Sequence, residues 1–147
     1  MPNNLPANYQ PTVYNQAVFS CRLATTANLA GVLTPLYENS GLGTTLTNSG
    51  ALAALAIDAV TPEIGDRVLL VAQTTTAQNG VYVVKEVGST TVAWVLTRAP
   101  DWCTIEQIKT GQYVPVEDGA TLKGKMYVFV RPLPGKVNVD AINFVQV

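Results

Sequence analysis

Carboxylates are the first candidates for general acid–base catalysis in this sequence. The chain has no histidine, which removes the commonest general base, the commonest zinc ligand and any Ser-His or Cys-His pair. It also has no G-x-S-x-G motif and no glycine-rich phosphate-binding loop. Glu117 and Asp118 follow a strand-like run, but Glu-Asp-Gly is typical of a solvated turn. The sequence therefore predicts no catalytic residue, no metal site and no cofactor, and a protein that is not an enzyme.

Two cysteines, Cys21 and Cys103, are the only candidates for redox or thiol chemistry. Their spacing fits no zinc or redox motif. In a reducing compartment, two buried thiols that act as small apolar side chains are the favoured interpretation. The sequence leaves open whether the two residues form a disulfide.

The charges that flank apolar runs, Asp66, Arg67, Arg98 and Asp101, are notable because only 13% of the residues are charged. Half-buried charges normally have a partner, so each of these is expected to be paired. The simpler interpretation is ion pairs, or hydrogen bonds to loop backbone, that hold the strand ends. The alternative places Arg67 or Arg98 at a contact between subunits, where arginine is enriched.

Trp94 and Trp102 allow two interpretations. An exposed indole could stack on a sugar ring, which would suit a receptor-binding protein. Filling of a core or an interface is the commoner role of a tryptophan in a strand. Trp102 is therefore a candidate partner contact together with Arg67 and Arg98.

Residues 1–16 differ from the rest of the chain, because they contain three prolines, several amides and no charged side chain. Proline fixes φ and removes a hydrogen-bond donor, so this composition favours an extended arm over a helix. Such an arm is either disordered or bound to a neighbouring subunit. Tyr9, Val13 and Tyr14 are the expected anchors in the second case, since tyrosine offers a large contact area.

Residues 17–147 read as a single β-domain with a loop-rich insertion at 28–50. The candidate strands are short apolar runs bounded by Gly, Asn, Pro or Asp, at 19–26, 68–71, 81–84, 94–96, 112–117, 125–131 and 141–147, with a further short strand at 44–47. About eight strands at this spacing predict an all-β fold, an antiparallel sandwich or a small barrel.

The pattern of apolar residues predicts which strands are covered. Both faces are apolar in 68–71, 81–84 and 125–131, so these strands are expected to be covered on two sides. In 112–117, Pro115 removes a donor and predicts an edge strand. In 19–26, alternation places Phe19, Cys21 and Leu23 on one face.

Two local signals mark connections between strands. The pair Asn79-Gly80 tolerates positive φ and is expected to end the loop before 81–84. Thr104 is placed to cap one helical turn that carries Glu106 and Lys109.

Four segments in order, GDRVLL at 65–70, QNGVYVV at 78–84, WVLTRAPDW at 94–102 and GQYVPVEDG at 111–119, resemble the β-domain of tailed-phage tail fibres and related virion proteins. The resemblance extends from about Leu23 to the C-terminus and implies a virion protein without an active site. It also implies a strand at 55–58. The helix-forming residues in ALAALAIDAV disagree with that strand, so we expect a helical turn just before it.

Composition limits the partners of the chain. A hydrophobic fraction of 48% with few charges predicts packing against copies of itself or another shell, although hydroxyl and amide groups could also keep a neutral β-domain soluble. A net charge of −1 without a basic stripe argues against nucleic-acid binding. No apolar run reaches 18 residues and the N-terminus does not resemble a signal peptide, so no membrane association and assembly in a host cytoplasm are expected.

The resemblance, combined with a short arm and no fibre shaft, implies a capsid decoration (cement) protein. Such a protein would lie on the outer capsid surface as a homotrimer, bound to the major capsid protein and to neighbouring copies. The alternative is a tail-fibre or host-recognition module in the tail that binds a cell-surface glycan through residues 28–50 and exposed aromatic side chains. A small carbohydrate-active enzyme is a third reading, disfavoured by the missing histidine.

Overall fold

The computed structural model describes residues 20–38, 40–130 and 135–147. The predicted arm, with Tyr9, Val13 and Tyr14, lies outside the described residues, as do Phe19 and Arg131. The predictions for these residues stay predictions.

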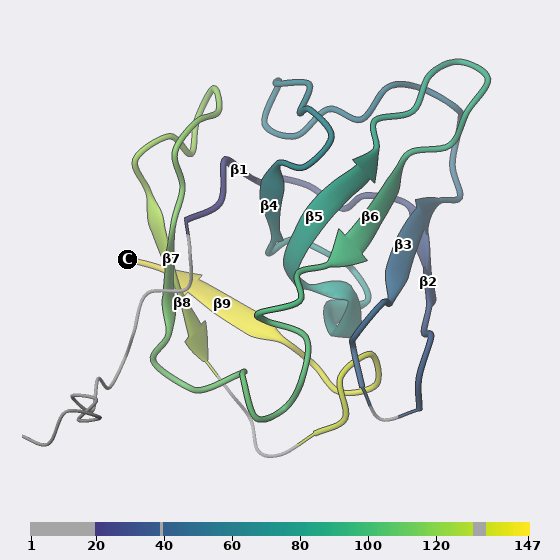
Figure 1. Ribbon diagram of the computed structural model, residues 1–147. Coiled ribbons are helices and arrows are strands. Elements are labelled where there is room, and N and C mark those ends of the chain that lie inside the picture. Colours follow the sequence, from purple (N-terminus) through teal and green to yellow (C-terminus); the bar gives the residue numbers. More distant parts are fainter. Residues whose placement is uncertain (1–19, 39, 131–134) are drawn as a thin grey trace, which may run out of the picture.

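The described residues form nine strands in two sheets, without α-helix (Figure 1). The strands are β1 (Leu23–Ala24), β2 (Gly31–Thr34), β3 (Thr45–Asn48), β4 (Arg67–Leu70), β5 (Gly80–Glu86), β6 (Val95–Arg98), β7 (Tyr113–Pro115), β8 (Met126–Val130) and β9 (Asn143–Gln146), with one 3₁₀ turn, η1 (Thr76–Gln78). One sheet has the order β1-β4-β5-β6-β3-β2 and the other β7-β8-β9. The sheets do not close into a barrel, so the predicted all-β class is confirmed in its sandwich form. All strand pairs are antiparallel except β1 with β4.

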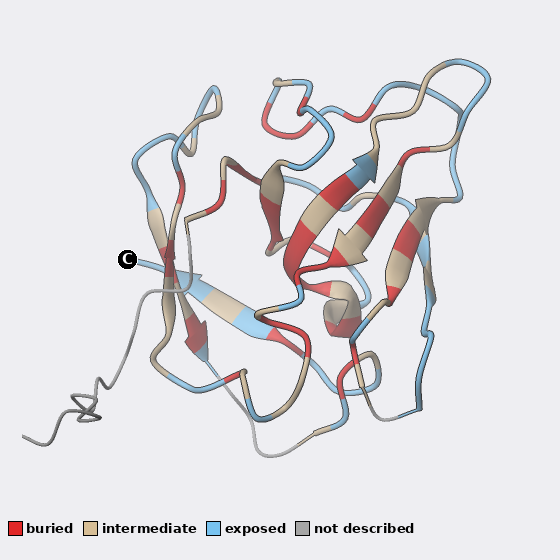
Figure 2. Cartoon of the chain, viewed as in Figure 1, coloured by how far each residue is buried: buried red, intermediate tan, exposed pale blue. Residues whose placement is uncertain are grey.

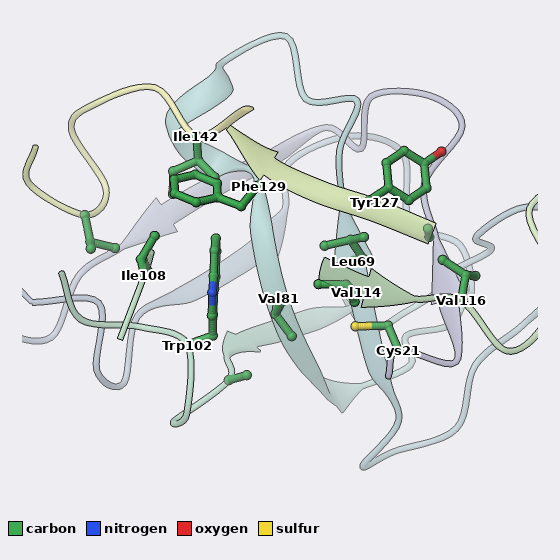
Figure 3. Close-up of a cluster of buried hydrophobic side chains, with 13 residues drawn as sticks. Cys21, Leu69, Val81, Trp102, Ile108, Val114, Val116, Tyr127, Phe129 and Ile142 are labelled. Atoms are coloured by element: carbon green, nitrogen blue, oxygen red, sulfur yellow. The ribbon is translucent and has the colours of Figure 1, made fainter. Parts of the chain in front are cut away.

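The two sheets pack on a shared buried cluster, which we call the inter-sheet cluster (Figure 3). The six-stranded sheet contributes Leu69 and Val81, and the three-stranded sheet contributes Val114, Tyr127 and Phe129. Burial of such side chains is the main favourable term in folding. The cluster therefore joins the two sheets into one body.

A second buried cluster lies on the opposite face of β4 and β5. It contains Val68 and Leu70 from β4 and Tyr82 and Val84 from β5. Each of the two strands thus alternates between the two clusters, and both are interior strands of the six-stranded sheet. The prediction that 68–71 and 81–84 are covered on both sides is confirmed.

The expected strand at 55–58 is wrong, and no helical turn precedes it. Only an isolated bridge joins Ile57 to Val60. Asp58 and Ala59 have φ of 48° and 63°, a left-handed conformation that turns the chain sharply and ends any extended run. Leu55 and Ile57 are still fully buried and cover one face of the six-stranded sheet.

Part of the segment 28–50 belongs to the larger sheet, because β2 and β3 form an antiparallel pair that extends the six-stranded sheet. The predicted strand at 44–47 corresponds to β3 within one residue. β2 was not predicted, because none of its residues is buried and its first residue is Gly31. Residues 35–38 and 40–44 lie between these two strands.

Two predictions about strand faces are also wrong. β8 is covered on one side only, because Tyr127 and Phe129 are buried whereas Val130 on the other face is 42% exposed. Cys21 and Leu23 lie in different clusters because the chain bends at Arg22. The edge position predicted from Pro115 is confirmed, since β7 is the outer strand of its sheet.

The connection after β6 forms a turn and no helix. Backbone amides of Gln107 and Ile108 donate to the carbonyl of Thr104. The side chain of Gln107 accepts from the amides of Cys103 and Thr104 at 2.9 and 3.1 Å. The predicted cap is wrong in that the Thr104 side chain accepts no hydrogen bond from any described residue; instead the side chain of Gln107, three residues later, accepts from the Thr104 amide. The predicted end of the earlier loop at Asn79-Gly80 is confirmed, since Gly80 has φ of 140° and begins β5.

Candidate partner-binding surfaces

Arg98 lies at the end of β6 and is the most deeply buried cation in the described part of the chain, at 1% exposed. Its guanidinium donates to the carbonyls of Ala77 and Asn79 at 2.7 and 3.0 Å and to Asn138 Oδ1 at 2.8 Å. It also lies 5.0 Å from the centroid of the Tyr82 ring. Burial lowers the pKa of Arg98, and these acceptors and the ring compensate the buried charge.

Arg98 therefore holds three segments together: η1, the turn at Asn79 and the loop that contains Asn138. The prediction of hydrogen bonds from a strand-end arginine to loop backbone is confirmed. The alternative, a subunit contact through Arg98, does not fit its burial, because no part of the side chain reaches the surface.

Arg67 forms a two-pronged ion pair with Asp101, with N–O distances of 2.8 and 3.2 Å. This pair joins β4 to the segment that follows β6. Asp66 binds Arg22 at 2.5 Å, and this hydrogen bond raises the pKa of Arg22. The predicted intramolecular pairing of Asp66, Arg67 and Asp101 is confirmed. Whether Arg67 also contacts a partner stays a prediction.

Trp102 and Trp94 fill the core and are 1% and 5% exposed. The Trp102 ring packs edge-on against Phe129 (Figure 3). The two ring centroids are 5.4 Å apart. Trp102 Nε1 donates to Gln112 Oε1 at 2.8 Å. The core interpretation is confirmed for both tryptophans, and Trp102 is not available to a partner or a sugar.

Both cysteines are free and buried, so the predicted reduced thiols are confirmed. Burial raises the pKa of Cys21 to about 12 and also raises the pKa of Cys103. A thiol with a raised pKa carries little thiolate at neutral pH and is a poor nucleophile.

Asp58, Glu117 and Asp118 use their carboxylates to hold local structure. Asp58 accepts hydrogen bonds from the amides of Thr121 and Leu122 and from the Thr121 hydroxyl. Burial acts to raise the pKa of Asp58, but these hydrogen bonds outweigh it and lower the pKa. Glu117 accepts from the Ser20 hydroxyl, and Asp118 accepts from the amide of Gly119. Within the described ranges, no three His, Cys, Asp or Glu side chains gather closely enough to hold a metal ion.

An uncharged apolar surface covers the side of the three-stranded sheet that faces away from the inter-sheet cluster. We call it the outer sheet face. Residues paired across the strands lie on the same side, so Tyr113, Val128 and Val145 form one row. The exposed members include Val130, Val145 and Val147, at 42%, 51% and 65%. Figure 2 shows β9 largely in the colour of exposed residues. The full face consists of Tyr113, Pro115, Met126, Val128, Val130, Asn143, Val145 and Val147.

A second surface feature is a groove of about 260 Å³ between the loop after β2 and the loop before β9. Pro35, Tyr37 and Glu38 line one side and residues 136–139 the other. Tyr37 and Val139 are 55% and 66% exposed. The sequence did not predict this groove, because its two sides are about a hundred residues apart and no local pattern relates them.

In comparisons with protein-family models, curated proteins and solved structures, nothing matches this chain. In the part of the chain that the structure describes, there is no helix of the length and hydropathy needed to cross a bilayer.

Proposed function

We propose that the chain is a structural protein of a tailed-phage virion, a capsid decoration protein that contacts neighbouring copies of itself through the outer sheet face. The observation that carries this proposal is the outer sheet face itself. Seven of its eight residues are apolar and none is charged. Exposed apolar patches mark interaction sites, and interface centres are depleted of charged residues. The four sequence motifs between residues 65 and 119, which resemble the β-domain of tailed-phage virion proteins, support the proposal that the particle is a phage virion.

The size of this face predicts how strongly copies associate. Three strands about 4.8 Å apart, with about five residues at 3.3 Å each, give a footprint of roughly 15 Å by 15 Å. A stable interface buries about 800 Å² on each partner. The face alone therefore supports weak association in dilute solution. On a shell that holds many copies close together, effective concentration makes the same contact strong. Binding of the assembled state in this way resists separation of the capsomers.

Copy number on purified particles tests the proposal. A stained gel of virions should show the chain in amounts comparable with the major capsid protein. A few copies per particle would contradict a decoration role and favour the alternative, a host-recognition module in the tail.

A pair of matched variants tests the contact surface. Val145→Lys introduces a charge on the outer sheet face, and Val92→Lys introduces one at a similarly exposed valine in the β5–β6 connection. We expect Val145→Lys to lower occupancy on capsids and to abolish concentration-dependent self-association in analytical ultracentrifugation. Val92→Lys should behave as the unmodified chain. Normal decoration by Val145→Lys would rule out the outer sheet face as the contact.

A further inference from the structure

We propose that the groove between residues 35–38 and 136–139 binds a single neutral pyranose ring. This inference concerns a different surface from the outer sheet face and does not depend on it. Three side chains of the groove have unused hydrogen-bonding or stacking capacity: Tyr37, Glu38 and Lys136. Within the described ranges, the Glu38 carboxylate and the Lys136 ammonium form no ion pair with any residue.

The wall of the groove at residues 136–139 is held in place by the buried Arg98. Asn138 has φ of 73° and uses its side chain twice, accepting from Arg98 Nε at 2.8 Å and donating to Thr44 Oγ1 at 2.9 Å. The second bond joins this loop to the residue just before β3, at the end of the connection that forms the other wall. The backbone amide of Lys136 donates to Asp140 Oδ2 at 2.7 Å within the same loop.

The opposite wall is also tied to the body of the protein. The amide of Gly41, in the connection that carries this wall, donates to the carbonyl of Cys103 at 2.8 Å. A groove whose walls are already ordered binds a small ligand without a large ordering cost. The hydrogen bonds of Asn138 and Gly41 therefore hold the two loops beside the groove.

The chemistry of the lining matches a neutral sugar. A pyranose has an apolar C–H face that suits the exposed Tyr37 ring, and hydroxyl groups that both donate and accept hydrogen bonds. The Glu38 carboxylate can only accept and the Lys136 ammonium can only donate, so together they can satisfy such hydroxyls. Their opposite charges leave no net charge to attract an ionic ligand. Val139, which is 66% exposed, adds apolar contact.

The volume of the groove limits the ligand to about one ring. Pockets for drug-sized ligands enclose roughly 300–1,000 Å³, more than the 260 Å³ found here. A ligand of about a dozen non-hydrogen atoms binds with a dissociation constant on the order of millimolar. Useful avidity would then require many copies on one particle.

Saturation-transfer NMR on the full chain tests the proposal, with glucose, galactose, N-acetylglucosamine and rhamnose as separate probes. We expect transfer to at least one sugar, competed by its methyl glycoside. Tyr37→Ala should weaken binding about fivefold or more, because it removes the stacking surface. Tyr37→Phe should retain binding because it keeps the ring. Ile64→Ala, which removes an exposed apolar side chain outside both the groove and the outer sheet face, should bind as the unmodified chain does.

Glu38→Gln supplies a second measurement that does not depend on the aromatic ring. This variant removes the charged acceptor and should weaken binding without changing the melting temperature. Absence of transfer to all four sugars at about 50 mM, well above a millimolar dissociation constant, would overturn the proposal. Equal binding by Tyr37→Ala and the unmodified chain would also overturn it, because the sugar would then lie elsewhere.

Discussion

Replacement of Arg98 by methionine is expected to destabilise the protein strongly, although arginine is normally a surface residue. Met has a comparable unbranched stem, so the change removes mainly the guanidinium. The carbonyls of Ala77 and Asn79 and the Asn138 side chain then lose their donor. An acceptor left unsatisfied in the interior costs about 1–3 kcal/mol.

The size of the effect follows from these three contacts. Three hydrogen bonds to a charged group would sum to about 4–9 kcal/mol, but removal of the cation also recovers its desolvation cost. The expected net loss is about 3–5 kcal/mol, in the range measured when one partner of a buried charged group is removed. For a chain of this length that corresponds to a melting temperature lower by about 6–20 °C.

Urea unfolding measures this loss, followed by fluorescence of the two buried tryptophans. The midpoint for Arg98→Met should fall by about 2 M at unchanged slope. Arg98→Lys keeps the charge but cannot reach all three acceptors. Its midpoint should therefore lie between the midpoints of Arg98→Met and the unmodified chain. Lys85→Met removes an exposed cation from β5 and serves as the control, with a midpoint close to that of the unmodified chain. An Arg98→Met midpoint within about 0.5 M of the unmodified chain would refute the structural role of Arg98.

Three further predictions concern Asp58, Gly119 and the cysteines. The pKa of Asp58 in the folded chain is below its ordinary value of 3.8, so the stabilisation by its carboxylate is present at neutral pH and is lost as pH falls through the folded pKa. Melting curves of Asp58→Asn should therefore show a smaller loss of stability between pH 5 and the acid limit than those of the unmodified chain. Equal losses in the two proteins would contradict this prediction. In Gly119→Ala the new Cβ would lie 2.3 Å from Asp58 Oδ2, whereas in Gly124→Ala, also at positive φ, the new Cβ has no atom within 4 Å. Urea unfolding should show a free energy of unfolding about 2 kcal/mol lower for Gly119→Ala than for Gly124→Ala. Equal values would show that the chain relieves the contact. Burial raises the pKa of Cys21 to about 12 and also raises the pKa of Cys103. Neither thiol should react with a chromogenic disulfide reagent at pH 8 until urea unfolds the chain. Rapid reaction of either thiol in the native protein would show that it is accessible.

The strands that were predicted well are those whose signals are local. β4 and β5 are runs of β-branched and aromatic residues between glycines or polar turns, and they occupy the centre of the larger sheet. The edge strand β2 lacked that signal, because an edge strand with exposed side chains needs no apolar run. The segment 55–58 was assigned wrongly because two residues with positive φ turn the chain immediately after Ile57.

The candidate surfaces depended on contacts that sequence patterns do not contain. The sequence predicts Arg98, Trp102 and Arg67 as partner contacts. Arg98 and Trp102 are buried in the folded chain and therefore cannot contact a partner. An alternating apolar strand such as β8 looks the same whether its second face is covered by protein or faces solvent. Val145 and the outer sheet face could therefore be recognised only from the exposed fractions of the side chains.

The linear order of residues was enough to establish the all-β class, the central strands and the pairing of strand-end charges, because strand propensity, turn residues and the cost of an unpaired charge act locally. Folding decided which charged and aromatic groups are inside and which apolar face stays open. Arg98 donates to Asn138, 40 residues later, and Tyr37 and Val139 line one groove although their loops are far apart in the sequence. Such contacts between distant residues depend on how the two sheets pack, and packing is a property of the whole chain.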